Sequence, residues 1–366
     1  MFKKTCVSSC LSGVALKSSL SHRRLVSSSS SSTVRSFHQS YSLNQHREKL
    51  KVGFIGLGQM GARMAPNLLK QDVNAFDVYA YDVMDANVDL TLKKQPNIKA
   101  CKSIEQIMQQ NPDCVITMLP TPKIVTEVYN EVVSLKEKYG GSKVDQNIRT
   151  VCIDSSTVDP KTVQDIQQLM EQKKLNISIM DAPVSGGVNG AENATLTFMV
   201  GTDNKTDFEF AKTLLSKMGK SIVLCGDKVG MGQVAKLCNN LVLAISMAGV
   251  SEALVLGTKL GMDPKVLSQI FGTSTAQCWS VTSYNPYPGV MENVPSSRNY
   301  EGGFAVNLML KDLGLVNGAA KNIGYDLAMG QMVEQLYKQA STNGLGQKDF
   351  GAILKYFKDQ LESKQK

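Results

Sequence analysis

The sequence predicts a Rossmann-type α/β domain followed by an all-α domain, with a long interdomain helix joining the two. Three observations lead to this prediction. A glycine fingerprint lies between a strand and a helix near residue 56, apolar strands alternate with helices from there to residue 226, and strand patterns are lost beyond that point. The 366 residues are enough for two domains. We expect the first over residues 51–227 and the second over residues 228–366.

The first 47 residues have the composition of a targeting segment. They hold seven Lys or Arg and no Asp or Glu, and they contain the serine run 27–32. Ser-rich, Arg-containing, acid-free leaders are typical of mitochondrial transit peptides. We therefore expect residues 1–47 to direct the chain to the mitochondrial matrix, with Arg35-Ser36-Phe37 as a plausible processing site. The alternative is a disordered low-complexity tail.

The rest of the chain is nearly neutral and has no histidine. Removing the seven leader charges from the net charge of +8 leaves +1, so a nucleic-acid-binding surface is not indicated. The three histidines, His22, His38 and His46, all lie in the leader. Once it is removed, a His general base, a Ser-His-Asp triad and a His-ligated metal are excluded, and we expect no metal.

Cysteines and apolar runs argue for a protein in a reducing compartment and not in a membrane. The eight cysteines show no CxxC spacing, and several lie inside apolar runs, so we expect them to be small buried hydrophobic residues. Glu252 and Lys259 interrupt the longest apolar stretch, so we expect no segment with the length of a membrane span.

The first expected strand, residues 51–55, runs directly into a glycine turn. The turn is Gly56-Leu57-Gly58-Gln59-Met60-Gly61, and a helical pattern continues to residue 70. This is the dinucleotide fingerprint in its strand–turn–helix context. Gly56 permits the tight turn, Gly58 lets the backbone approach a pyrophosphate, and Gly61 lets helix and strand pack closely.

The second expected strand, residues 78–81, ends in an acidic residue. Asp82 follows Gly61 by 21 residues. A carboxylate at this place binds the ribose hydroxyls and repels a 2′-phosphate, which favours NAD over NADP. The alternative is a glycine-rich turn with a chance aspartate.

Two more buried strands are expected at residues 113–119 and 150–154, with helices over 125–139 and from Asp159-Pro160 to 174. Ligands of a doubly wound sheet bind beyond the carboxyl ends of its strands. Leu119, Pro120 and Thr157 follow such ends, so we expect cofactor contacts there. Ordinary strand-terminating turns are the alternative.

A strand over residues 177–182 leads into Ser185-Gly186-Gly187. Consecutive backbone N–H groups without side chains suit a carboxylate, and the Ser185 hydroxyl adds a donor. A flexible turn is an equally good interpretation of these three residues alone. Strands at 197–200 and 221–224 complete the first domain.

The interdomain helix is expected over residues 230–260 as one long buried helix. Gln233, Lys236 and Asn240 lie on one face of its opening turns, and residues 241–250 are almost wholly apolar. Burying a lysine and an asparagine is costly, so we take Lys236 as the candidate catalytic residue. The alternatives are a lysine that only forms a salt bridge and an asparagine that only caps backbone groups.

Four further helices are expected at residues 264–272, 306–322, 326–342 and 348–362. Between the first two lies the irregular segment 278–303, which holds Trp279 and three prolines. Long loops in compact domains are often functional lids, and a structural wrap over the helices is the alternative.

Five ordered motifs carry a family resemblance. They are FIGLGQMGARMAPNL (54–68), DAPVSGG (181–187), GMGQVAKLCNN (230–240), CWSVTSYNPYPGVMENVPSSRNYEGGF (278–304) and LMLKDLGL (308–315). From about residue 51 to near the C-terminus, the chain resembles the β-hydroxyacid dehydrogenase family. The last two motifs look like the branch that acts on 3-hydroxyisobutyrate.

The resemblance implies NAD-dependent oxidation of 3-hydroxyisobutyrate to methylmalonate semialdehyde in valine catabolism, with Lys236 as general acid/base. The implied substrate-binding residues are Ser185, Gly186, Gly187 and Asn240. The implied cofactor-binding residues are Val52, Gly56, Leu57, Gly58, Gln59, Met60, Gly61, Asp82, Val83, Leu119, Pro120, Thr157 and Lys311.

Other functions are compatible with parts of this sequence. A relative could reduce tartronate semialdehyde or glyoxylate. Decarboxylating 6-phosphogluconate enzymes carry a His-Asn pair where this chain has Asn239-Asn240. The chain could also be a non-catalytic NAD-binding module, but such a module would not require a lysine at position 236. We expect a small-molecule substrate and a homo-oligomer, a dimer or tetramer, with no nucleic-acid or membrane partner.

Overall fold

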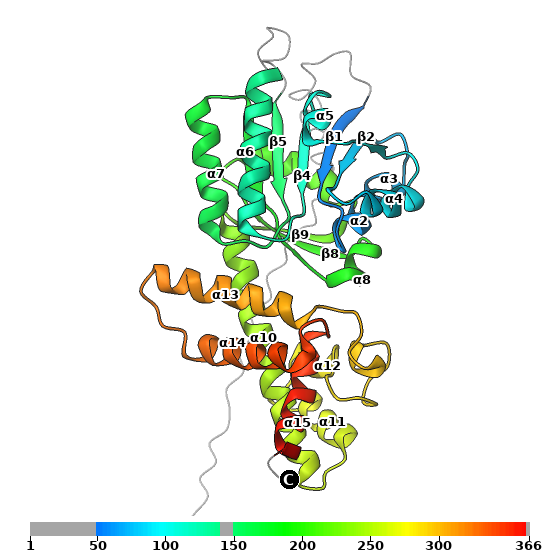
Figure 1. Cartoon of the computed structure of the whole chain (residues 1–366), viewed down its shortest axis with the longest axis vertical. Coiled ribbons are helices and arrows are strands. Elements are labelled where there is room, and N and C mark those ends of the chain that lie inside the picture. The colour runs from blue at the N-terminus through cyan, green and yellow to red at the C-terminus, as the bar shows by residue number, and fades with distance from the viewer. Residues whose placement is uncertain (1–48, 140–148, 364–366) are drawn as a thin grey trace, which may run out of the picture. The chain divides into compact units, whose positions relative to one another are not determined.

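The computed structural model describes residues 49–139 and 149–363. The expected transit peptide and the three histidines lie outside these ranges. Residues 49–366 form one compact unit. Within it, a sheet half and a helical half are joined by the helix α10 (Met231–Lys259), as Figure 1 shows. The predicted fold class is confirmed.

The sheet half is built on nine strands. They are β1 (Leu50–Ile55), β2 (Phe76–Tyr81), β3 (Lys99–Ala100), β4 (Cys114–Thr117), β5 (Thr150–Asp154), β6 (Ile177–Asp181), β7 (Val184–Ser185), β8 (Leu196–Gly201) and β9 (Gly219–Gly226). Their order is β3-β2-β1-β4-β5-β6-β8-β7, with β9 beside β8. The first six run parallel, and β8 is antiparallel to β6 and β7. All seven predicted strands are present, and the two-residue strands β3 and β7 were not anticipated.

Helices cover the sheet on both faces (Figure 1). They are α2 (Gly61–Met64), α3 (Asn67–Lys70), α4 (Asp85–Lys94), α5 (Ile104–Met108), α6 (Pro122–Tyr139), α7 (Pro160–Lys173), α8 (Gly187–Glu192) and α9 (Lys205–Leu215). The Asp159 carboxylate caps α7 by accepting from the Thr162 N–H, and Pro160 occupies the first turn. The sheet core includes Tyr129, Ile107 and Cys152, all fully buried.

The chain reverses direction across the sheet at β1, which lies between β2 and β4. A doubly wound sheet opens a crevice for its ligand at this point, outside the carboxyl ends of the strands. Those ends face the helical half in Figure 1. The predicted cofactor edge therefore lies next to α10.

Helix α10 is buried on one side only. Its face with Gln233, Lys236 and Asn240 is buried, whereas Val242 is 67% exposed and Leu260 is 79% exposed. The prediction of a wholly buried helix was wrong. By length and composition alone α10 could also cross a membrane, so the expectation that no stretch reaches such a length was wrong as well. It packs here against β8, β9, α13 and α15.

The helical half surrounds the lower part of α10 (Figure 1). Its other helices are α11 (Pro264–Thr273), α12 (Trp279–Thr282), η2 (Pro295–Arg298), α13 (Val306–Asn322), α14 (Ala328–Ala340), η3 (Ser341–Leu345), η4 (Phe350–Ala352) and α15 (Ile353–Ser363). The four further helices predicted there are confirmed.

The segment 278–303 is fastened to the helical half at several points. Trp279 stacks on Tyr284 with ring centroids 4.6 Å apart, and the Tyr284 hydroxyl donates to the buried Asp349 carboxylate at 2.8 Å. The Tyr300 hydroxyl donates to the Pro286 carbonyl. These contacts favour the structural wrap over the mobile lid.

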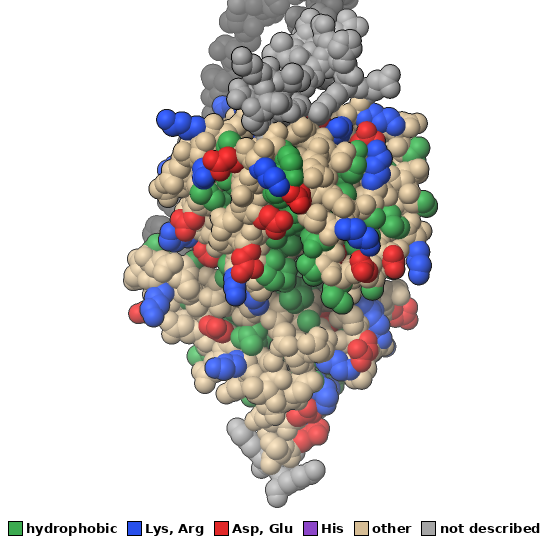
Figure 2. Space-filling view, turned by 45° about the horizontal axis from the view of Figure 1, so that its top comes forward, with side chains coloured by type: hydrophobic (Ala, Val, Ile, Leu, Met, Phe, Trp, Pro, Cys, Tyr) green, Lys and Arg blue, Asp and Glu red, His purple; other side chains and the backbone are tan. Residues whose placement is uncertain are grey.

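The cysteines only partly follow the prediction. Cys101, Cys114 and Cys152 are buried, but Cys225 and Cys278 are half-buried and Cys238 is exposed on α10. The prediction failed for Cys225, Cys238 and Cys278 for the same reason as for α10. An apolar stretch of sequence does not reveal which of its side chains are covered in the fold. Figure 2 shows charged side chains of both signs interspersed on one face, with hydrophobic side chains gathered in a band down its middle.

Candidate active site

The glycine turn after β1 has the geometry that a dinucleotide requires. Gly56 adopts a φ of +93°, and a Cβ there would lie 2.4 Å from the Met118 carbonyl oxygen. A Cβ on Gly61 would lie 1.9 Å from the Gly56 oxygen, so helix and strand pack in direct contact. A Cβ on Gly58 would meet no atom within 4 Å. The open backbone at Gly58 leaves room for a phosphate group.

Asp82 closes this turn from the end of β2. Its carboxylate accepts from the Leu57 N–H at 2.6 Å and from the Met84 N–H at 2.8 Å. Val83, next in the chain, is 82% exposed. The open turn and the carboxylate beside it fit the diphosphate and the ribose of NAD.

A second edge of the crevice is held together by the buried Asp154 at the end of β5. Its Oδ1 accepts from the Thr117 hydroxyl at 2.7 Å and from the Ser156 hydroxyl at 2.6 Å. Ser156 Oγ in turn accepts from the Leu119 N–H at 2.8 Å. Burial raises the pKa of Asp154, and hydrogen bonds from Ser156 and Thr117 oppose the rise. This network fixes the backbone at Leu119, where a cofactor contact is expected.

The first turn of α10 is anchored to two strand ends. The Gln233 side chain accepts from the Val158 N–H at 3.1 Å and donates to the Ser156 carbonyl at 2.8 Å. The Asp181 carboxylate, at the end of β6, accepts from the Gly230 N–H at 2.6 Å and from the Gln233 N–H at 2.7 Å. The catalytic candidate on the next turn is therefore positioned from the sheet.

Lys236 is a buried lysine in an unusual electrostatic setting. Its side chain is 9% exposed, and among the described residues none forms a hydrogen bond or ion pair with its Nζ. Burial lowers the pKa of Lys236; the charge of Lys311 lowers it further, and that of Asp312 opposes. A lowered pKa increases the share of the neutral amine, the form that can act as a base.

Asn240 and Lys311 meet through Asp312. The Asn240 amide donates to Asp312 Oδ2 at 2.6 Å, and Lys311 Nζ lies 3.0 Å from Asp312 Oδ1. Lys311 Nζ also donates to the Thr157 carbonyl at 2.7 Å. Four of the predicted site residues, on α10, α13 and the end of β5, are thus brought to one place.

The turn at 185–187 follows β6 and is open to solvent. Gly186 and Gly187 are exposed, and a Cβ on Gly187 would meet no atom within 4 Å. The following helix α8 is tied to the fingerprint helices, because the Asn67 amide donates to the Ala191 carbonyl at 2.7 Å and Arg63 pairs with Glu192 at 3.3 Å. No described contact joins this turn to Lys236.

Other predicted cofactor residues differ in how they lie. Gln59, Met60 and Pro120 border the crevice with at least part of each side chain exposed. Val52 is fully buried inside β1, between Val78 of β2 and Cys114 of β4. Its side chain belongs to the sheet core and is not at the cofactor edge.

Three carboxylates of this region were not predicted as site residues from the sequence: Asp154, Asp181 and Asp312. Each is buried and holds a partner far away in the sequence. A weak signal existed for two of them, because Asp181 opens the DAPVSGG motif and Asp312 follows Lys311 directly.

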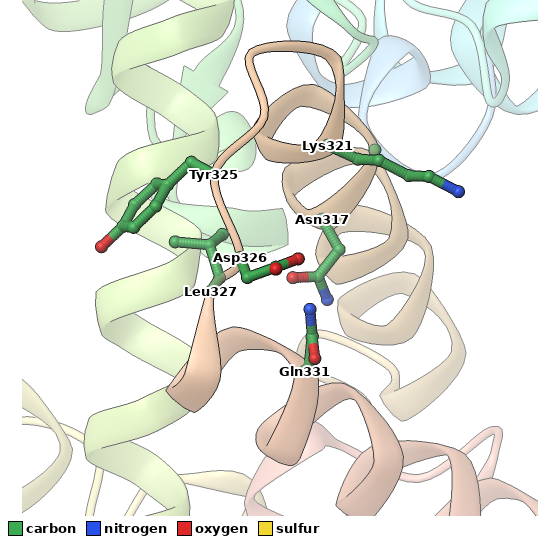
Figure 3. Close-up of a pocket in the computed structure, with 7 residues that line it drawn as sticks. Asn317, Lys321, Tyr325, Asp326, Leu327 and Gln331 are labelled. Carbon is green, nitrogen blue, oxygen red and sulfur yellow. The ribbon is translucent and has the colours of Figure 1, made fainter.

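A separate pocket of about 390 Å³ lies at the connection between α13 and α14 (Figure 3). Its lining residues are Asn317, Gly318, Lys321, Tyr325, Asp326, Leu327 and Gln331. Asp326 and Asn317 turn toward one another across it, whereas Lys321 points away. None of the predicted site residues lines this pocket, so it is not part of the crevice. No group of three or more His, Cys, Asp or Glu in residues 49–139 and 149–363 could hold a metal ion.

Two family models match the chain one after the other, over residues 51–226 and 230–357. The NAD binding domain of 6-phosphogluconate dehydrogenase matches residues 51–226. The NAD-binding domain of NADP-dependent 3-hydroxyisobutyrate dehydrogenase matches residues 230–357. The sheet order, the glycine turn and these matches define an NAD-dependent oxidoreductase.

Curated relatives narrow the class. The chain is 45% identical to a Dictyostelium discoideum protein named "Probable 3-hydroxyisobutyrate dehydrogenase, mitochondrial", over 85% of this chain and 92% of that protein. It is 41% identical to the mitochondrial 3-hydroxyisobutyrate dehydrogenase of Mus musculus, over 85% and 88%. The chain belongs to the 3-hydroxyisobutyrate dehydrogenase family.

Solved structures agree in fold. A Mycobacterium tuberculosis 3-hydroxyisobutyrate dehydrogenase with L-serine aligns with a TM-score of 0.75 and 32% identity, over 84% of this chain and 99% of that one. A Salmonella typhimurium 3-hydroxyisobutyrate dehydrogenase aligns with a TM-score of 0.66 and 22% identity, over 84% and 99%, which supports the fold alone.

Proposed function

We propose that this protein oxidises 3-hydroxyisobutyrate to methylmalonate semialdehyde with NAD, and that Lys236 is the general acid/base. The observation that carries the proposal is a buried lysine with a lowered pKa, set beside Lys311, Asp312 and Asn240 at the carboxyl ends of the strands. The family of the chain supports the substrate and its place in valine catabolism.

The residues of the glycine turn and strand ends hold the cofactor. Gly56, Gly58 and Gly61 let the backbone approach the diphosphate, and Asp82 binds the ribose hydroxyls. Thr157 and Lys311 lie at the far side of the crevice, joined by the hydrogen bond from Lys311 to the Thr157 carbonyl. Bound NAD supplies the acceptor for the hydride that leaves the carbinol carbon.

Lys236 takes the proton of the substrate hydroxyl. The described chain has no histidine, and burial beside Lys311 favours the neutral amine that a base must present. Asp312 orients the Asn240 amide by accepting one of its N–H groups, and the Asn240 oxygen accepts from the Asn239 amide at 3.1 Å. The second N–H of Asn240 is left for the substrate. In the reverse reaction Lys236 returns the proton.

The substrate carboxylate binds at Ser185, Gly186 and Gly187. The backbone there is exposed, with open space beside Gly187, so its N–H groups can reach an anion. L-Serine, which accompanies the mycobacterial relative, is itself a 3-hydroxy acid with a carboxylate. A 3-hydroxy acid spans a carboxylate site and a base, which is the arrangement proposed here.

Replacing Lys236 by Met tests the assignment, because Met keeps the volume of the side chain and removes its base. We expect kcat to fall by about 10²-fold or more, the typical share of a general base, while NADH binding stays within about threefold. Steady-state rates and a fluorescence titration with NADH measure the two quantities.

Lys136→Met is the matched control. Lys136 is also buried, but it lies on α6 and bonds to Thr150 at the start of β5, away from the strand ends that hold the site. The control enzyme should lose stability without losing kcat. If Lys236→Met turned over near the wild-type rate, Lys236 would not be the base.

We further propose the division of the chain into a transit peptide (1–47), a cofactor domain (51–227) and a helical domain (228–366). Mitochondrial relatives support import into the matrix, which N-terminal sequencing of the mature protein checks. Exposed apolar side chains on α10 and α14, such as Val242 and Met332, support a homo-oligomer, which light scattering checks.

A further inference from the structure

We propose that Asp181 is a positioning residue for this reaction, which fixes Lys236 relative to the strand end that leads into the 185–187 turn. The proposal rests on the proposed role of Lys236. In this proposal, the Asp181 carboxylate keeps Lys236 and the 185–187 turn at a fixed position relative to one another.

Both oxygens of the Asp181 carboxylate accept hydrogen bonds from the first turn of α10. Asp181 Oδ1 accepts from the Gly230 N–H at 2.6 Å, and Oδ2 accepts from the Gln233 N–H at 2.7 Å. These donors span the first turn of α10, and Lys236 follows Gln233 by one turn. Because the N–H groups of a first turn have no partner within the helix, the two bonds to Asp181 replace the missing ones.

The slot that receives the carboxylate is walled by backbone. A Cβ on Gly201 of β8 would lie 2.5 Å from Asp181 Oδ1, and a Cβ on Gly232 of α10 would lie 2.8 Å from Oδ2. Side chains are therefore excluded at both positions. Asp181 itself is fully buried. The fit demands a short side chain with two acceptor oxygens, which only aspartate provides.

Its place in the chain makes these hydrogen bonds relevant to catalysis. Asp181 is the last residue of β6, paired with Asp154 of β5 and Gly201 of β8. Ser185 follows four residues later. One side chain thus connects the strand that carries the substrate turn with the helix that carries Lys236. Small displacements of a reacting group, on the scale of 1 Å, can cost about 10²-fold in rate.

The same carboxylate titrates near the working pH. Burial raises the pKa of Asp181 to about 7, the N–H groups of Gly230 and Gln233 oppose the rise, and Asp154 adds to it. The other titratable neighbour is Cys225 of β9, whose thiol pKa is raised by burial and by Asp181. Protonation of Asp181 makes one of its oxygens a hydroxyl, which is a much weaker acceptor for a backbone N–H than a carboxylate oxygen. Both hydrogen bonds from α10 to Asp181 are therefore at full strength only above about pH 7.

The reduction direction separates Asp181 from Lys236. There Lys236 must be protonated, so its titration lowers the rate as pH rises, whereas Asp181 must be ionised, so its titration lowers the rate as pH falls. No histidine lies in residues 49–366 to add an acid limb. We expect wild-type kcat for semialdehyde reduction to fall below about pH 7.

Asp181→Asn is the variant to measure, because it keeps the volume and mimics the protonated state. We expect kcat to drop by about 10- to 100-fold, with the KM for NAD within about threefold, and the acid limb of reduction near pH 7 to vanish. Asp349, whose pKa burial raises to about 6, remains in the variant and can account for any limb that persists at lower pH.

Asp207→Asn is the matched control. Asp207 is a buried carboxylate that pairs with Arg149 and accepts from the Ser178 hydroxyl, at the opposite ends of the same strands. Its loss should lower the melting temperature and leave kcat and the pH profile of the folded enzyme unchanged.

The outcomes decide separately on the two proposals. A wild-type kcat with an intact acid limb in Asp181→Asn overturns the positioning role while Lys236→Met can still be inactive. If Asp181→Asn does not fold, the wild-type profile decides, because a flat rate of reduction across pH 7 contradicts the inference. Turnover by Lys236→Met sinks the proposed function itself.

Discussion

Burial lowers the pKa of Lys236 most, and two side chains of opposite sign that are adjacent on α13 shift it further. Lys311 lowers the pKa of Lys236 and Asp312 raises it. The two neighbours also pair with one another at 3.0 Å. The pKa of the proposed base can therefore be shifted by substitutions on a second helix, without a change at Lys236.

A pair of substitutions should move the pH dependence of oxidation in opposite directions. If Lys236 is the base, as proposed, oxidation needs its neutral amine, so the rate of oxidation rises with pH through the pKa of Lys236. Lys311→Met removes a positive neighbour, raises this pKa and shifts the rise to higher pH. Asp312→Asn removes a negative neighbour, lowers the pKa and shifts the rise to lower pH. Profiles of kcat/KM against pH measure both shifts, and two shifts of the same sign would refute the electrostatic account.

Residue by residue, the sequence found the groups that sit in motifs and missed those defined by their partners. Lys236 and Asn240 stood out as polar residues on an apolar helix. Asp312 holds Asn240 from 72 residues away, and Asp181 holds Gly230 from 49 residues away. Pairings at such separations depend on how strands and helices are arranged, which periodicity does not encode.

The glycine turn between β1 and α2 shows how one element combines folding and binding requirements. At Gly61 the neighbouring backbone fills the place of a side chain, and at Gly58 the space is open. The fold therefore requires glycine at position 61, and we expect that ligand binding requires glycine at position 58.

Two alanine substitutions should separate these requirements. Gly61→Ala places a methyl group 1.9 Å from the Gly56 oxygen, so we expect a loss of about 1–3 kcal/mol in the free energy of unfolding. Gly58→Ala meets no atom within 4 Å, so stability should change by less than about 0.5 kcal/mol while NAD binds about tenfold more weakly. Thermal unfolding and a cofactor titration measure the pair. An equal loss of stability in both variants would contradict this division.

Among the elements, long periodic segments were predictable and short or uniformly apolar ones were not. Strand β5 and helix α13 have the bounds that their patterns predicted. Strands β3 and β7 have two residues each, too few for a period of two to show. The exposed side of α10 could not be found, because a helix that is apolar all round does not reveal which face its neighbours cover.

At the scale of the whole chain, α10 connects the cofactor edge to the helical half and carries the proposed base, Lys236. Its first turn is held by Gln233 and Asp181 to the ends of β5 and β6, and its lower part packs on α13 and α15. The order of domains and the cofactor class followed from the glycine turn and the loss of strands. The choice among 3-hydroxy acids did not, because no described contact defines the side of the crevice that would distinguish them.

A substrate panel with the mature enzyme tests the central claim most directly. The compounds are 3-hydroxyisobutyrate and 6-phosphogluconate in the oxidation direction, and tartronate semialdehyde and glyoxylate in reduction. We predict NADH formation from 3-hydroxyisobutyrate with a kcat/KM at least about tenfold above that for any other compound, and no release of carbon dioxide. A higher kcat/KM for tartronate semialdehyde or glyoxylate, or no hydride transfer with any compound, would contradict the account.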